Sequence, residues 1–84
     1  MNRIEAKMII ENEKLSGFNW NEDRYYNENE VGIKFADNVW LTYATDERAS
    51  VITGSKKEFD SEEEALDDFI CRLRADKVLR DIVS

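Results

Sequence analysis

The sequence predicts an α+β fold: an antiparallel, three- to four-stranded meander with an N-terminal and a C-terminal helix packed on one face. Helical spacing of apolar residues at both ends of the chain and strand alternation in its middle predict this class. The 84 residues include no proline and no low-complexity linker, so we expect residues 1–84 to form a single domain. The expected element order is α-β-β-β-(β)-α.

The first helix is predicted over residues 2–16, which contain neither glycine nor proline. Ile4, Met8 and Leu15 fall on one helical stripe, which would face the core. Gly17 follows as the expected left-handed residue that ends the helix.

A polar stretch at 19–30, rich in Asn and Glu, predicts a long loop with room for one short strand at 24–27. Trp20, Tyr25 and Tyr26 interrupt this polar stretch. The loop could fold back and cover Trp40, which would form a second small core, or leave Trp40 exposed.

The same loop has a weak likeness to a calcium-binding EF-hand loop. Asn19, Asn21, Asp23 and Glu30 occupy positions 1, 3, 5 and 12 of that pattern. Arg24 stands where the pattern requires glycine, and position 1 lacks its aspartate. We therefore expect no metal and no other cofactor.

The clearest strand signal is a predicted hairpin with a three-residue loop at 36–38, in which Asn38 is left-handed. This loop would pair Phe35 with Val39 and Ile33 with Leu41. The register would place six alternating apolar residues on one face: Val31, Ile33, Phe35, Val39, Leu41 and Tyr43. The other face would carry Lys34, Trp40 and Thr42 and stay open.

Two further segments follow the hairpin. A turn at 45–48 leads to an expected strand at 49–53, whose apolar members are Val51 and Ile52. Lys57–Phe59 is too short for the sequence to decide whether it adds a fourth, edge strand.

Ser61 and Glu64 form a capping-box pattern that opens the second helix. Its apolar stripe repeats at i, i+3, i+4 and i+7: Leu66, Phe69, Ile70 and Leu73. Val78, Leu79 and Ile82 lie on a different side, so we expect a kink or a separate short helix from about Asp76. Cys71, alone in the chain, is expected to be a small packing residue.

Composition excludes several functions. A net charge of -7 and a longest basic run of two lysines argue against nucleic acid as a partner. The chain has no histidine, which removes the usual general base and the commonest transition-metal ligand. No apolar run is long enough for a membrane span and no signal-peptide pattern opens the chain. We expect a cytoplasmic protein that is not an enzyme.

Acidic and aromatic residues instead indicate a protein-binding surface. Seven of the eleven residues from 58 to 68 are acidic and none is basic. The helix dipole explains acids in the first turn of the second helix but not those one turn later. An exposed tryptophan beside acids is typical of a protein-binding hot spot. The candidate partner-binding residues are Glu22, Asp23, Tyr26, Glu28, Trp40, Asp46, Glu47, Glu63, Glu64, Asp67 and Asp68.

Five short motifs resemble those of small acidic immunity proteins from bacterial polymorphic toxin systems, and together they span nearly the whole chain. They are Gly17-Phe18-Asn19-Trp20, Val31-Gly32-Ile33, Trp40-Leu41-Thr42-Tyr43, Thr45-Asp46-Glu47-Arg48 and Glu63-Glu64-Ala65-Leu66-Asp67-Asp68-Phe69-Ile70. The resemblance implies that the protein neutralises one cognate protein toxin by tight binding. An acidic inhibitor can block a basic cleft by mimicking phosphate charge.

Two other classes remain open. One is a protein-binding regulator or subunit of a housekeeping complex. The other is a structural homodimer that associates through the apolar residues 78–82, so the free protein is expected to be a monomer or a homodimer.

Overall fold

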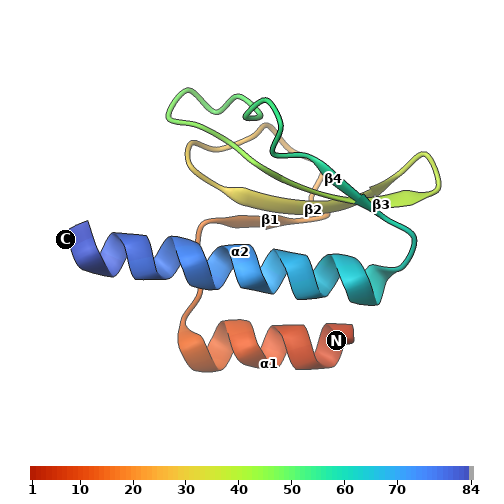
Figure 1. The fold of residues 1–84 in the computed structure, drawn as a ribbon, viewed down its shortest axis with the longest axis horizontal. Coiled ribbons are helices and arrows are strands. Elements are labelled where there is room, and N and C mark those ends of the chain that lie inside the picture. The colour runs from red at the N-terminus through yellow and green to blue at the C-terminus, as the bar shows by residue number, and fades with distance from the viewer. Residues whose placement is uncertain (84) are drawn as a thin grey trace.

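The computed structural model describes residues 1–83 and confirms the α+β class and the α-β-β-β-β-α order (Figure 1). Its elements are α1 (Arg3–Glu13), β1 (Phe18–Trp20), β2 (Val31–Ala36), β3 (Val39–Ala44), β4 (Lys57–Phe59) and α2 (Glu62–Val83). The strands form one sheet in the order β1-β2-β3-β4. α2 runs along one face of this sheet, and α1 packs beside α2 on the side away from the strands.

Helix α1 begins at a capping box. The Asn2 side chain accepts a hydrogen bond from the Glu5 backbone at 2.8 Å, and the Glu5 carboxylate accepts one from the Asn2 backbone at 3.5 Å. The helix ends at Lys14, whose φ of 54° is left-handed. The predicted stop at Gly17 is therefore wrong, although Gly17 also has a positive φ of 73°.

The buried side of α1 also differs from the predicted stripe. Ile4 and Met8 are 71% and 56% exposed, whereas Ala6 is fully buried. Only Leu15 of the three predicted stripe residues is in the core. A small residue at position 6 lets α1 approach α2 closely, so α1 turns this side toward the core.

Strand β1 is a parallel edge strand that the sequence did not reveal. Phe18 pairs with Val31 and Trp20 pairs with Ile33. The strand predicted at 24–27 does not form. Residues 21–30 carry the chain from the end of β1 back to the start of β2, as the parallel pairing of these strands requires. At three residues, β1 is too short to show alternation.

The β2–β3 hairpin has a two-residue loop, so the predicted three-residue loop is wrong. Asp37 and Asn38 both have positive φ angles, 51° and 64°, as a type I′ turn requires. The register pairs Phe35 with Trp40 and Ile33 with Thr42.

This one-residue difference moves side chains between faces. Trp40 and Thr42 join Ile33 on the helix-covered face, and Thr42 is fully buried. Tyr43 is buried as predicted but lies on the opposite face, across from Gly32. Phe35, predicted as core, is 49% exposed near the hairpin end.

Residues 45–56 form turns in place of the strand predicted at 49–53. Thr45 and Val51 make an isolated bridge. The Asp46 carboxylate accepts hydrogen bonds from the Arg48 and Ser50 backbones at 2.8 and 3.1 Å, so these donors are not available to a strand partner. β4 then pairs antiparallel with β3, which makes Lys57–Phe59 the fourth strand.

Helix α2 is continuous from Glu62 to Val83, so the predicted kink near Asp76 is wrong. Ser61 Oγ accepts from the Glu64 backbone at 3.2 Å, as expected of the cap. The last turns extend past the strands (Figure 1). Val78, Leu79 and Ile82 are 57%, 62% and 73% exposed for that reason.

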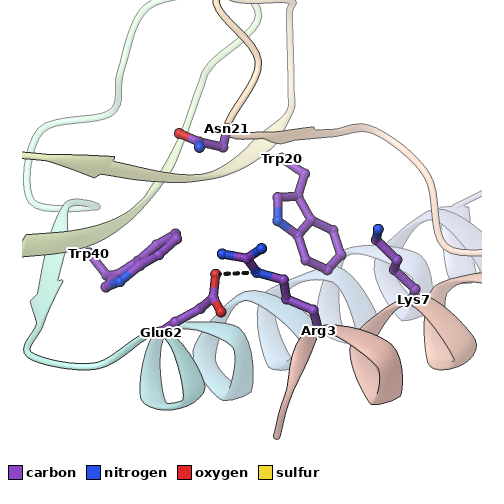
Figure 2. Close-up of a pocket in the computed structure, with 6 residues that line it drawn as sticks. All are labelled: Arg3, Lys7, Trp20, Asn21, Trp40 and Glu62. Atoms are coloured by element: carbon purple, nitrogen blue, oxygen red, sulfur yellow. Dashed lines mark hydrogen bonds and ion pairs between the residues drawn. The ribbon is translucent and has the colours of Figure 1, made fainter.

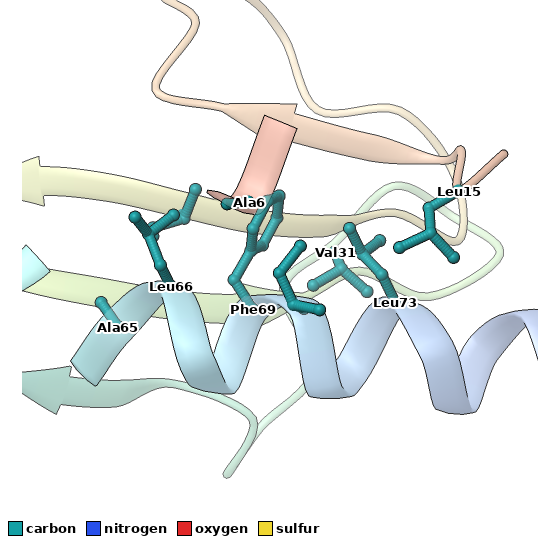
Figure 3. Packing of buried hydrophobic residues seen from close by; sticks show 9 residues of the cluster. Ala6, Leu15, Val31, Ala65, Leu66, Phe69 and Leu73 are labelled. Carbon is teal, nitrogen blue, oxygen red and sulfur yellow. The ribbon is translucent and has the colours of Figure 1, made fainter. Parts of the chain in front are cut away.

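The core lies between α2 and the sheet, and the predicted α2 stripe lines it (Figure 3). Phe69 is its centre, with the Phe18 and Trp20 rings edge-on to it at centroid distances of 6.0 and 5.7 Å. Cys71 is exposed on α2, so the prediction that it is a packing residue is wrong.

Candidate functional site

The candidate acidic residues form two groups, one in loops and one on α2. Glu28, Asp46 and Glu47 lie at the end of the sheet away from the start of α2, whereas Glu22 and Asp23 follow the end of β1 that points toward Phe35. Glu22, Asp23, Glu28, Asp46 and Glu47, here called the loop acidic patch, lie in the connections that follow β1 and β3. Glu63, Glu64, Asp67 and Asp68, the helix acidic patch, lie in the first turns of α2. β4 ends beside Trp40 at the start of β3 and leads directly into α2, whereas residue 45 follows the other end of β3.

An ion pair between a buried carboxylate and a partly exposed arginine shapes the loop after β1. The Glu30 carboxylate is 2% exposed, and Arg24 contacts it at 3.0 Å. Arg24 also donates to the Phe18 carbonyl at 3.2 Å, and the Asn27 backbone donates to Glu30 at 3.1 Å. Glu30 raises the pKa of the Arg24 guanidinium. Hydrogen bonding to a buried carboxylate therefore holds the loop in one conformation.

These contacts also use the oxygens of the calcium-like pattern. Asn19 Oδ1 accepts from the Glu22 backbone at 2.8 Å, and Glu30 is bonded to Arg24. Across residues 1–83, no cluster of three or more Asp, Glu or Cys side chains is arranged to hold a metal ion.

The two connections of the loop acidic patch are joined through Thr45. Its hydroxyl donates to the Asn27 carbonyl at 2.7 Å and accepts from the Glu30 backbone at 2.8 Å. The Asn29 backbone donates to the Asp46 carbonyl at 3.0 Å. The side chains of Glu28 and Glu47 are exposed on these joined loops, while the Asp46 carboxylate caps its own turn.

Tyr26 belongs to a second aromatic cluster on the outer face of the sheet. Its ring centroid lies 5.2 Å from that of Tyr43, and Lys34 Nζ lies 3.3 Å from its hydroxyl. The loop thus folds back over Tyr43. Tyr25 beside it is 97% exposed, and the candidate set did not include it.

In the helix acidic patch, two of the four acids have partners within the chain that the sequence did not reveal. Asp67 contacts the Met1 ammonium at 2.7 Å and raises its pKa. Asp68 accepts from Thr42 Oγ1 at 2.6 Å and contacts Arg72 at 2.8 Å. Glu63 and Glu64 have exposed side chains. The acids one turn into α2 therefore fix the helix in place.

Trp40 lies in a groove that the sequence did not predict. The half-buried indole faces the helices, and its ring centroid is 5.1 Å from that of Phe35. The groove measures about 400 Å³, and its lining combines two indoles with charged and polar groups: Arg3, Lys7, Trp20, Asn21, Trp40 and Glu62 (Figure 2). The shorter hairpin loop accounts for the error, since it places Trp40 on this face.

Most positive charge on the arginines is used within the fold. Five of the six arginines form ion pairs with acids of the chain: Arg3, Arg24, Arg72, Arg74 and Arg80. Arg74 contacts Glu13 at 2.6 Å and lowers the pKa of that carboxyl. Two of these pairs, Arg3–Glu62 and Arg74–Glu13, join α1 to α2, and the net charge of -7 leaves carboxylates in excess.

Neither α1 nor α2 combines the length and apolar character that crossing a bilayer requires. The chain matches no protein-family model, no curated protein and no solved structure.

Proposed function

We propose that this protein is an immunity protein, which binds one cognate bacterial toxin in the cytoplasm and blocks it. One observation carries the proposal: both acidic patches expose carboxylates, at Glu28, Glu47, Glu63 and Glu64, while five of the six arginines are paired within the fold. A surface of this kind attracts a basic partner and speeds the encounter. A toxin that acts on a phosphate-bearing substrate would present such a basic cleft.

A binding role also agrees with the chemistry of the chain. It has no histidine, and Glu30, its one fully buried carboxylate among residues 1–82, is paired with Arg24. A catalytic carboxylate needs an apolar pocket that raises its pKa. We therefore propose that the protein acts by occupancy and is not an enzyme.

The two ends of the sheet offer two docking orientations. The loop acidic patch is accompanied by the exposed Tyr25, and the helix acidic patch lies beside Trp40. Aromatic anchors mainly slow dissociation, whereas exposed charges mainly speed association. The toxin contacts would combine one acidic patch with its neighbouring aromatic residue.

Co-expression with the product of the adjacent upstream gene tests the proposal. Rescue of growth, with co-purification of a stable complex, is the expected result. A harmless neighbour, or killing without rescue and without a complex, would contradict it.

A second candidate is a self-associating regulator or subunit of a housekeeping complex, and the exposed end of α2 favours it. Val78, Leu79 and Ile82 are exposed on consecutive turns. Light scattering of the free protein distinguishes the two: a dimer that Ile82→Glu converts to a monomer would favour the second candidate, and a monomer would favour the first.

A further inference from the structure

The groove beside Trp40 already contains a guanidinium. Arg3 is the first residue of α1, and its side chain points into the opening between the two indoles (Figure 2). Its Nε donates to Glu62 at 2.7 Å. Glu62 is 23% exposed on its side chain and Arg3 is 63% exposed. The chain therefore holds a solvated arginine in its own groove.

This internal contact is a weak one. Among residues 1–82, Nε is the one nitrogen of Arg3 that makes a hydrogen bond. A guanidinium that approached Glu62 freely could donate two parallel N–H bonds, which are stronger and better oriented. An exposed one-point ion pair contributes little stability, so another arginine can displace it.

The walls of the groove suit the same type of ligand. Trp40 and Trp20 present indoles, whose faces attract cations and stack on guanidinium planes. Lys7 Nζ already lies 5.8 Å from the centroid of Trp20, which leaves Trp40 for an incoming group. When Arg3 has moved out of the groove, the charges of Glu62 and Lys7 cancel. The net charge of -7 on the whole protein then favours the binding of a cation.

We propose that this groove binds an arginine side chain of the partner protein, which takes the place of Arg3 against Glu62 and Trp40. The proposal rests on the proposed function, because a basic toxin cleft would supply that arginine. It identifies the groove as the anchor site next to the helix acidic patch. Arg3 acts there as an internal competitor that keeps the carboxylate paired while no partner is bound.

The test uses N-acetyl-arginine amide as the probe and needs no toxin. The indole N–H signals of Trp20 and Trp40 are followed by NMR while the probe is added to the full chain. We expect saturable shifts of both signals, with a dissociation constant about threefold lower in Arg3→Ala and Arg3→Gln than in the wild type, because the competitor is gone. Well-dispersed spectra of both variants confirm that they are folded.

Glu62→Gln should abolish the saturable shifts. The matched control is Glu58→Gln, which removes the same charge from an exposed position on β4 and should leave binding unchanged. Equal binding in Glu62→Gln and the wild type, or no saturation in either Arg3 variant, would overturn the proposal. Saturable shifts with N-acetyl-glutamate in place of the arginine probe would also overturn it and would identify an anion site.

The two hypotheses fail separately. Binding of the arginine probe without rescue of a toxic neighbour would reject the immunity role and keep the groove. Rescue without probe binding would keep the immunity role and reject the arginine-binding groove.

Discussion

Tyr43 lies directly over Gly32, its partner across the β2–β3 ladder. A Cβ atom on residue 32 would sit 1.9 Å from Tyr43 Cζ and 2.3 Å from its hydroxyl oxygen. The tyrosine ring therefore occupies the volume that any other side chain at position 32 would need. Tyr26 covers the same ring from the loop, which gives the outer face of the sheet its own small core.

Replacement of Gly32 by alanine should destabilise the fold by about 3 kcal/mol, because the ring must leave its site. Gly54→Ala is the control: its φ is +84° but nothing lies within 4 Å of the added Cβ, so about 1 kcal/mol is expected. Urea denaturation measures both. Equal losses would show that the Tyr43 ring moves aside freely.

Stability should fall as the pH rises from about 10 to 12. Burial raises the pKa of Tyr43 to about 12 from its ordinary 10.0. The folded state then keeps its proton where the unfolded state loses it, so this contribution is complete below pH 10 and is lost through pH 12. Its full size is about 2 to 3 kcal/mol.

Tyr43→Phe should remove this part of the pH dependence, as measured by urea midpoints between pH 8 and pH 12. Tyr25→Phe is the matched control, since that side chain is 97% exposed. A Tyr43→Phe profile that follows the wild-type profile would contradict the assignment to Tyr43.

Arg24→Met should destabilise the protein by about 3 kcal/mol, because it leaves the Glu30 carboxylate buried without its partner. The double variant Arg24→Met/Glu30→Gln should recover part of that loss, since no charge then remains buried. Thermal unfolding of the two variants gives the comparison. Arg48→Met, at an exposed loop position, should have little effect.

The two acidic patches can be compared by paired neutralisation. If the partner docks through the groove, Glu63→Gln/Glu64→Gln should slow association several-fold at low salt, because both side chains face outward beside that groove. Glu28→Gln/Glu47→Gln removes the same charge at the far end and should change the rate little. Stopped-flow mixing with the toxin at two salt concentrations measures this, and the reverse pattern would place the partner on the loop acidic patch.

Elements marked by long, regular patterns were predictable from the sequence. Features that depend on the conformation of one or two residues were not. The stripe from Leu66 to Leu73 lies where expected, whereas the sequence left open whether Lys57–Phe59 forms a strand. The hairpin failed because Asp37 and Asn38 both adopt the left-handed region, which shortens the loop by one residue and transfers Trp40 to the helix side. β1 was not predicted, because three residues are too few to show alternation and its parallel pairing with β2 is made across the loop at 21–30.

The candidate site shows the same limit. Composition located the acids and the turn pattern located their loops, yet the roles of Asp67 and Asp68 depend on partners 66 and 26 residues away in the chain. The groove combines side chains from four separate elements and the loop after β1. No local pattern marks such a site.

The sheet has two six-residue strands in its centre and a three-residue strand at each edge. The unpaired side of an edge strand is where another polypeptide can add a strand by backbone hydrogen bonding. Short edge strands limit such strand addition. β1 and β4 each offer only three residues for such addition, and β4 carries Lys57. The two short edge strands therefore limit association between the sheets of neighbouring copies of the protein.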